Sequence, residues 1–290
     1  MLFVYLHIEK EFERILKKPG SSPTTHTQMN TKTMKKLMIT LTVGLCSLFA
    51  TAQELPLKKE AVFQEGEVLQ YKLRYGFITA AEATIKVTNS DLKFDNKSTY
   101  KLTVDAQTSG TFDIFYKIRD HYDSYIDKND LLPYFYQENI REASYRRQDK
   151  ARFTQDAKKV VSNRGTFTTP TNQTFDLVSA YYFARSLDIS KIKTGDKFKL
   201  NYFLGDEISA LEVEYVGKET VKSKLGNIRC LKFSPSIKPG RIFKKDSRLY
   251  LWVTDDGNRV PVKAQVEILV GAVTMELKSA DGLKYALAKE

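Results

Sequence analysis

Apolar and polar residues alternate with a period of two along most of the chain after residue 60. Leu69, Tyr71 and Leu73 fall on one face of an extended segment, while the polar residues between them fall on the other. Such alternation is typical of half-buried antiparallel strands. The same pattern predicts further strands near residues 81–88, 100–106, 118–126, 134–141, 145–153, 158–163, 198–202, 211–215, 228–233, 249–253, 262–270 and 273–277.

One segment has the periodicity of a helix instead. From Leu177 to Leu187, apolar residues recur at the three- and four-residue spacing of a single helix face. Asp176 precedes this segment, and its carboxylate can cap the first backbone N–H groups. The pattern therefore predicts one main helix that ends near Asp188, and a single helical turn is expected in TFDIFY at 111–116.

The many strands and the single main helix predict an all-β, mainly antiparallel fold. A sheet of this length curls to bury one face and to protect its edges. We expect a long meandering sheet curled into a partly open barrel that holds the helix; the alternative is a two-sheet β-sandwich. No internal repeat or clear interior linker interrupts the pattern, so residues 53–290 are expected to form a single β-rich exported domain.

An export signal is predicted inside the chain, at residues 34–52. Lys35 and Lys36 form a basic start, an apolar run covers 37–50, and Ala50-Thr51-Ala52 supplies small residues for cleavage. The alternative of a membrane anchor is disfavoured because spanning a bilayer takes about 20 apolar residues. Lipid modification of Cys46 is also disfavoured, since the bulky Leu45 precedes it.

The position of this signal gives two expectations. Because a signal peptide normally begins a chain, residues 1–33 are interpreted as a mis-called N-terminal extension; a true extension with its own role is the alternative. The mature protein is expected in the periplasm of a Gram-negative bacterium or outside the cell. No stable membrane span is expected after cleavage.

The composition of the chain argues against a disulfide and against a metal site. The chain has a net charge of +11, and removal of residues 1–52 leaves a modest basic excess. That excess permits contact with anionic lipids or glycans without requiring it. Cys230 is the only cysteine after residue 52, so no intramolecular disulfide is expected. With His121 as the only remaining histidine, neither a metal site nor another cofactor is expected.

The densest polar cluster is Arg119–Asp123. In a strand, Arg119, His121 and Asp123 share one face. His121 could act as a general base oriented by Asp123, but no nucleophile motif accompanies it. A buried ion pair of Asp120 with Arg119 or Arg185 is the preferred interpretation.

Two basic groups could contact an anionic glycan or a lipid head group, with a solvated face as the default interpretation. Export makes nucleic acid an improbable partner, so none is expected. The groups are Arg141, Arg146, Arg147, Lys150 and Arg152, and Lys238, Arg241, Lys244, Lys245 and Arg248.

Several short motifs occur in an order that resembles an exported bacterial family, domain of unknown function 3108. The resemblance covers roughly residues 63–283 and implies an exported β-rich domain, with no established activity and no catalytic residue to transfer. The general design is also similar to that of periplasmic lipoprotein carriers. The motifs are Gly66-Glu67-x-Leu69-x-Tyr71 with Tyr75-Gly76, Arg119-Asp120-x-Tyr122-x-Ser124, Leu132-Pro133, Asp176-Leu177-x-Ser179-Ala180-Tyr181-Tyr182-x-x-Arg185 and Thr254-Asp255-x-x-x-Arg259-x-Pro261-Val262.

Three functional hypotheses remain, and the absence of a catalytic motif favours a non-enzymatic role. The first is a binding or carrier domain for an apolar or amphiphilic ligand, such as a lipid, held between the sheet and the helix; a continuous apolar cavity would favour it. The second is an envelope protein that binds or degrades glycans, which an open groove lined with Asp, Arg and Tyr would favour. The third is a structural or assembly partner in the envelope, indicated by a flat exposed apolar patch. The candidate ligand-binding residues are Arg119, Asp120, His121, Tyr122, Tyr181, Tyr182 and Arg185.

Overall fold

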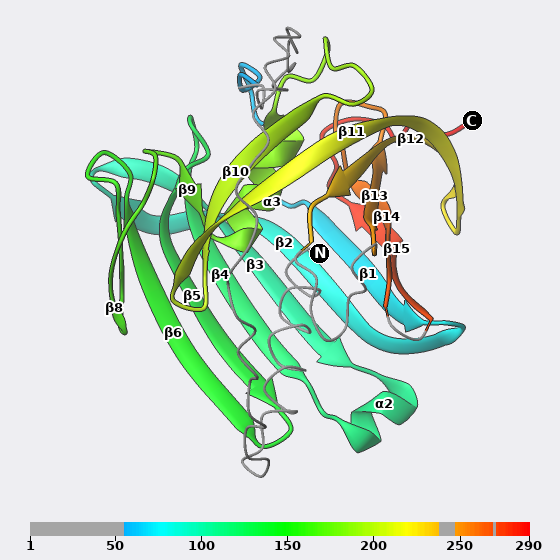
Figure 1. Ribbon diagram of the computed structural model, residues 1–290, viewed down its shortest axis with the longest axis horizontal. Coiled ribbons are helices and arrows are strands. Elements are labelled where there is room, and N and C mark those ends of the chain that lie inside the picture. The colour runs from blue at the N-terminus through cyan, green and yellow to red at the C-terminus, as the bar shows by residue number, and fades with distance from the viewer. Residues whose placement is uncertain (1–54, 238–246, 269–270) are drawn as a thin grey trace, which may run out of the picture.

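A computed structural model describes residues 55–237, 247–268 and 271–290 (Figure 1). The predicted signal, the segment 1–33 and most of the second basic group lie outside these residues. Within the described part of the chain, no helix is long and apolar enough to cross a membrane.

The described strands form one sheet of fifteen strands, in the order β8-β7-β6-β5-β4-β3-β2-β1-β15-β14-β13-β12-β11-β10-β9. Every neighbouring pair is antiparallel except β9 and β10. The strands are β1 Val68–Tyr75, β2 Ile78–Phe94, β3 Lys97–Thr108, β4 Arg119–Asp127, β5 Pro133–Glu142, β6 Tyr145–Thr154, β7 Lys159–Ser162, β8 Gly165–Thr168, β9 Thr174–Phe175, β10 Lys197–Leu204, β11 Glu207–Ser223, β12 Gly226–Pro235, β13 Leu249–Thr254, β14 Pro261–Glu267 and β15 Ala272–Asp281.

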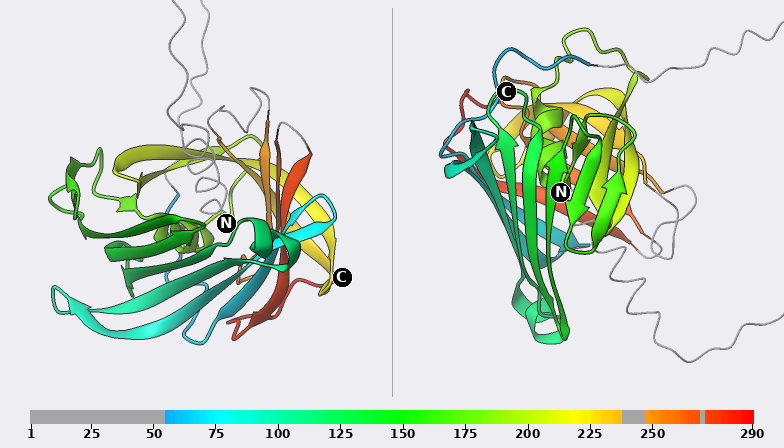
Figure 2. Two further views of the ribbon diagram at one scale, coloured as in Figure 1. Left: turned by 90° about the horizontal axis from the view of Figure 1, so that it is seen from below. Right: turned by 90° about the vertical axis from the view of Figure 1, so that its left-hand side faces the viewer.

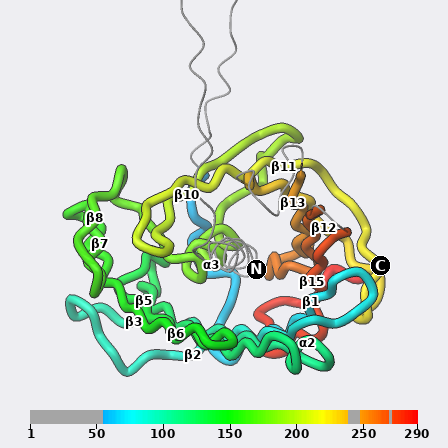
Figure 3. Tube along the Cα trace, turned by 60° about the horizontal axis from the view of Figure 1, so that its bottom comes forward, coloured from blue at the N-terminus to red at the C-terminus, as the bar shows by residue number. Residues whose placement is uncertain are grey.

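The sheet curls around a central helix. β1 pairs with β15, so the two halves of the chain meet in one continuous ladder whose free ends are β8 and β9. Two further views show the sheet wrapping the helix α3, Leu177–Ser186 (Figures 2 and 3). The partly open barrel is confirmed, and the alternative of two separate sheets is not what forms.

The core lies between the concave face of the sheet and α3. On β1, Leu69, Tyr71 and Leu73 are buried, as their alternation predicted. The predicted strand at 81–88 is only the buried part of β2, because the strand continues to Phe94 with mostly exposed polar residues. Alternation thus detects the half-buried portion of a strand and misses the part that extends beyond the core.

The two helices have very different surroundings. α2, Gly110–Phe115, forms where a single turn was predicted, and none of its residues is buried. α3 is almost entirely buried, and Asp176 caps it by accepting hydrogen bonds of 2.9 Å from the backbone N–H groups of Val178 and Ser179. Ser124 on β4 donates to the same carboxylate at 2.6 Å. The cap therefore also fixes α3 to the sheet.

A side chain bridges the two ends of the open sheet. Gln155, which follows β6, donates from Nε2 to the carbonyls of Thr174 (2.9 Å) and Pro133 (3.2 Å). Its Oε1 accepts from the backbone N–H of Thr174 at 3.1 Å. The amide therefore bonds to β9 as a neighbouring strand would, and it satisfies backbone groups that a free edge leaves unpaired.

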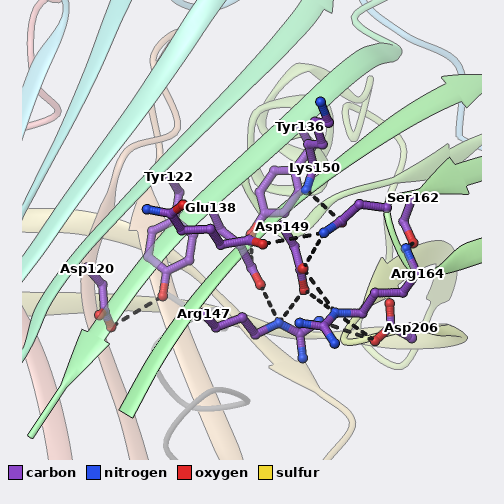
Figure 4. A network of polar contacts seen from close by, with 12 residues as sticks. Asp120, Tyr122, Tyr136, Glu138, Arg147, Asp149, Lys150, Ser162, Arg164 and Asp206 are labelled. Carbon is purple, nitrogen blue, oxygen red and sulfur yellow. Dashed lines mark hydrogen bonds and ion pairs between the residues drawn. The ribbon is translucent and has the colours of Figure 1, made fainter. Parts of the chain in front are cut away.

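An ionic cluster also crosses the seam, near the start of β6 (Figure 4). Arg147 on β6 faces Glu138 on β5 at 3.0 Å, and it also contacts Asp149. Asp206, in the turn between β10 and β11, lies 3.3 Å from Arg147 and 3.8 Å from Arg164. These contacts join the first half of the sheet to the second across the open seam.

We predict that Gln155→Ala weakens the seam locally. A buried backbone group without its partner costs about 1–3 kcal/mol, so urea denaturation should show a loss of that size. Hydrogen exchange at the Thr174 amide should accelerate more than exchange in β3. The control is Gln148→Ala, which changes an exposed glutamine on β6, the strand that Gln155 follows. Equal effects of the two variants would contradict the bridging role.

Candidate functional site

An apolar cavity of about 110 Å³ lies between α3 and strands β10 to β13. Each strand contributes alternate residues, as expected for one face of a sheet. The lining residues are Leu177, Ala180, Tyr181, Ala184, Arg185, Ile189, Phe198, Leu200, Leu211, Val213, Phe233, Pro235, Leu249, Leu251, Val253 and Arg259.

Helix periodicity explains which part of α3 faces the cavity. Leu177, Ala180, Tyr181, Ala184 and Arg185 follow a spacing of three, four, seven and eight residues, which places them on one face. Two of these residues are alanines. Their small side chains leave unfilled space beneath the helix, so the sequence of α3 itself contributes to the cavity.

A buried ion pair forms the polar end of this region. Arg185 on α3 donates from Nη1 and Nη2 to the two carboxylate oxygens of Glu67, at 2.6 and 2.8 Å. Both side chains are at most 2% exposed. Tyr182 adds a hydrogen bond of 3.1 Å to the same carboxylate, and Arg185 Nε donates to the Asn258 carbonyl at 3.1 Å. Such bidentate geometry compensates the desolvation of both charges.

Arg259 caps the C-terminal end of α3. Its Nη1 donates to the carbonyls of Arg185 and Leu187, which the helix leaves without internal partners. Burial lowers the pKa of Arg259, although Asp188, Asp255 and Asp256 act in the opposite direction. No carboxylate of a described residue lies within 4 Å of its guanidinium.

Two tyrosine hydroxyls near this end, those of Tyr71 and Tyr181, are buried and make no hydrogen bond of standard geometry. They are neighbours, and each affects the pKa of the other. Burial raises the pKa of Tyr181 to about 12, so its hydroxyl stays protonated and can donate. A buried unpaired hydroxyl is unfavourable in a folded protein. The Tyr181 hydroxyl is therefore available to a ligand in the cavity.

The structure divides the candidate residues between two places. Tyr181 and Arg185 line the cavity, and Tyr182 holds Glu67 beside it. Asp120 and Tyr122 lie on the inner face of β4, where the Tyr122 hydroxyl donates to Asp120 at 3.3 Å (Figure 4). Arg119 and His121 lie on the opposite face of the same strand and line an outer groove, to which Asp120 also contributes. One cluster in the sequence therefore serves two faces.

The predicted ion pair between Asp120 and either Arg119 or Arg185 is not found, so that prediction is wrong. Arg119 pairs with Asp113 on α2 at 2.6 Å, and Arg185 pairs with Glu67. Alternation along β4 turns Arg119 away from Asp120. Asp120 instead accepts from the backbone N–H of Arg141 at 3.0 Å.

His121 has a carboxylate on each ring nitrogen. Nδ1 lies 2.7 Å from Asp105 and Nε2 lies 3.2 Å from Asp123. Burial lowers the pKa of His121, but hydrogen bonds to the two carboxylates outweigh burial and raise it above the usual value. A general base needs a free nitrogen, and in this arrangement both nitrogens are engaged.

Two polar grooves of about 360 and 440 Å³ cross the outer face on either side of His121. Their linings combine acids, amides, arginine, lysine and His121, and neither lining contains a Phe, Tyr or Trp side chain. The outer grooves therefore supply the Asp and Arg of the predicted glycan site and lack its tyrosine.

From the first basic group, Arg147 points inward to Glu138, and Arg152 pairs with Asp95 at 3.1 Å.

Among the described residues, the three most exposed large apolar side chains lie at one end of the sheet. Phe77 lies in the turn between β1 and β2, and Ile114 and Phe115 lie on α2; all three are more than 80% exposed. Ser109 N–H donates to the Ala80 carbonyl at 3.0 Å, which keeps α2 beside the start of β2 (Figure 1).

Cysteine and metal chemistry find no support in the described residues. Cys230 is buried, and burial raises the pKa of its thiol to about 12, so the reactive thiolate does not form near neutral pH. Within the described ranges, no group of three or more His, Cys, Asp or Glu side chains is placed to hold a metal ion.

Sequence reasoning did not select Glu67 and Arg259 as site residues. Both belong to motifs noted above, and each is a charged residue next to an apolar strand. The available signal was that Glu67 directly precedes the apolar positions of β1. A charged residue buried beside them would need a partner, because charged residues are almost never fully buried unless paired.

Fold and cavity together define an open β-barrel-like protein with an internal helix. The family model for proteins of unknown function, DUF3108, matches residues 70–278, and the chain belongs to this family. No curated protein matches significantly.

Several solved structures match most of the chain. A β-barrel-like protein of domain of unknown function DUF1849 from Brucella abortus is 11% identical with a TM-score of 0.51, over 76% of this chain and 99% of that one. A protein from Bacteroides fragilis described as exported, with a YmcC-like fold, is 12% identical (TM-score 0.38; 77% and 99%). A protein from Parabacteroides distasonis described as a lipoprotein is 11% identical (TM-score 0.34; 77% and 100%). At these identities, only the Brucella likeness supports a shared fold, and none indicates an activity.

We predict that Glu67→Gln destabilises the fold strongly, because it leaves the Arg185 charge buried without its counter-ion. Breaking a buried pair costs about 3–5 kcal/mol, measurable by urea denaturation followed through the single tryptophan, Trp252. The matched control is Glu212→Gln, which breaks the half-exposed Lys197–Glu212 pair (2.9 Å) and should change the free energy of unfolding by less than about 1 kcal/mol. Similar losses in both variants would argue against a central role for the buried pair.

His121 gives a pH prediction. Its pKa is raised on folding, so its stabilising contribution is complete below the unfolded value of about 6.5 and is lost as the pH rises through the folded value. NMR titration should give a midpoint above 6.5, and Asp105→Asn should lower it. His121→Gln should destabilise the protein more at pH 5.5 than at pH 8.5. The reverse order would show that the carboxylates do not stabilise the imidazolium.

Proposed function

We propose that this protein is an exported, non-enzymatic binding or carrier domain for a small amphiphilic ligand, and that the ligand's apolar part occupies the cavity under α3. The observation that supports the proposal most directly is the cavity itself, an apolar space of about 110 Å³ with charged groups at one end. Ligand sites combine apolar walls with a few polar groups in this way.

The size of the cavity limits the ligand. Small-molecule sites usually measure about 300–1,000 Å³, and a cavity of about 150 Å³ holds one benzene molecule. About 110 Å³ therefore suits an alkyl segment of roughly four carbons and not a complete lipid chain. We propose a short-chain amphiphile, or the end of a longer chain whose remainder lies outside.

A glycan role receives less support. Carbohydrate sites that use aromatic stacking need exposed Tyr, Trp or Phe rings, and the linings of the two outer grooves contain none of these residues. His121 lies between two carboxylates, which favours its charged form over its action as a base. The binding proposal is therefore preferred to the glycan alternative.

Filling the cavity should abolish binding. Ala184 lines the cavity from α3, and Ala184→Leu adds three carbon atoms to that space. Titration of the purified protein with pentan-1-ol, followed by NMR of the valine and leucine methyl groups, should show binding that weakens at least about tenfold in the variant, given about 0.8 kcal/mol per buried methylene.

The matched control is Ala210→Leu. Ala210 is exposed on β11 next to Leu211, which lines the cavity, so the same substitution falls on the opposite face of the same strand. This variant should bind like the original protein. Pentan-1-ol that shifts no cavity methyl group, or equal binding by both variants, would refute the proposed site.

A further inference from the structure

The charge of Arg259 is the only cavity-lining charge that lacks a counter-ion close by among the described residues. Arg185 also lines the cavity, but Glu67 neutralises it through two short hydrogen bonds. Arg259 is 7% exposed, and its hydrogen bonds run from Nη1 to two backbone carbonyls. Its Nε and Nη2 donors make no hydrogen bond to a described residue.

A second donor lines the same cavity. The Tyr181 hydroxyl is buried, and it makes no hydrogen bond of standard geometry to a described residue. Its polar neighbours are the hydroxyl of Tyr71 and the guanidinium of Arg185, so its proton has no carboxylate or carbonyl acceptor. A buried cation and a buried hydroxyl are each unfavourable when unpaired. Both residues line the same small cavity, so an anionic group with two oxygens supplies an acceptor for each of these donors.

We propose that the ligand of this cavity carries a carboxylate, which Arg259 binds through its guanidinium and to which the Tyr181 hydroxyl donates. This inference rests on the proposed binding function and specifies the head group of the ligand. A carboxylate matches the planar fork of a guanidinium. A phosphate dianion would need a second available cation, and the charge of Arg185 is already taken by Glu67.

The position of Arg259 agrees with an amphiphile. Its guanidinium lies at the C-terminal end of α3, beside the carbonyls of Arg185 and Leu187, while the walls formed by β10 to β13 are apolar. A ligand with its carboxylate at this end would extend an alkyl chain along the alanine-rich face of the helix. Charge and apolar surface are thus separated as they are in a short fatty acid.

The decisive experiment compares head groups on one chain. NMR titrations at pH 7.5 would use pentanoate, pentan-1-ol and pentyltrimethylammonium. We expect pentanoate to bind at least about tenfold more tightly than the alcohol, as hydrogen bonds to charged groups allow, and the ammonium compound to bind most weakly. The cavity methyl groups of Leu200, Leu251 and Val253 should report all binding.

Two variants test the named donors. Tyr181→Phe removes only a hydroxyl that makes no hydrogen bond of standard geometry, so the fold should remain nearly as stable. Pentanoate affinity should fall several-fold, and pentan-1-ol affinity should not change. Arg259→Gln should abolish the preference for pentanoate, and Arg259→Lys should restore part of it. Arg152→Gln, on the exposed pair with Asp95, is the control that changes the same charge away from the cavity.

The outcomes separate the two proposals. If the alcohol binds in the cavity as tightly as pentanoate, the carboxylate inference is wrong and the binding function stands. If no compound shifts the cavity methyl groups, both proposals fail. A pentanoate preference that Arg259→Gln leaves intact would also overturn the inference, because the anion would then be held elsewhere.

Discussion

The ion pair of Glu67 and Arg185 is the contact on which the rest of the structure depends. It joins the start of β1 to the last turn of α3, and Arg185 also bonds to the carbonyl of Asn258 between β13 and β14. Segments far apart in the chain thus meet at one buried guanidinium. Because neither charge is stable in the core without the other, the pair tolerates only one position of the helix inside the sheet.

Fixing the helix in this way also creates the space beneath it. The sheet curls around one buried helix, which lies on its concave face (Figure 3). Asp176 holds the first turn of α3 to β4, and Arg259 holds the last. With both ends held, the face of the helix that carries Ala180 and Ala184 does not collapse onto β10 to β13, and the cavity remains.

The sequence predicted the architecture well and the site only in part. Alternation placed Leu69, Tyr71 and Leu73 in the core, and helical spacing placed Tyr181 and Arg185 on α3. It grouped Arg119–Asp123 as one cluster, whereas the strand presents His121 outside and Asp120 inside. Local periodicity specifies which residues share a face; it carries no information on which distant face lies opposite.

By itself, the sequence determined that the chain forms a curled antiparallel sheet with one buried helix, because periods of two and of 3.6 residues are local properties of the chain. Only the tertiary structure decided that Arg185 pairs with Glu67 and that Arg259 faces the cavity with no carboxylate of a described residue within 4 Å. Ion pairing depends on distance in space, and the chain offers many carboxylates to each arginine. The chemistry of the cavity is set by which of these pairings the fold allows.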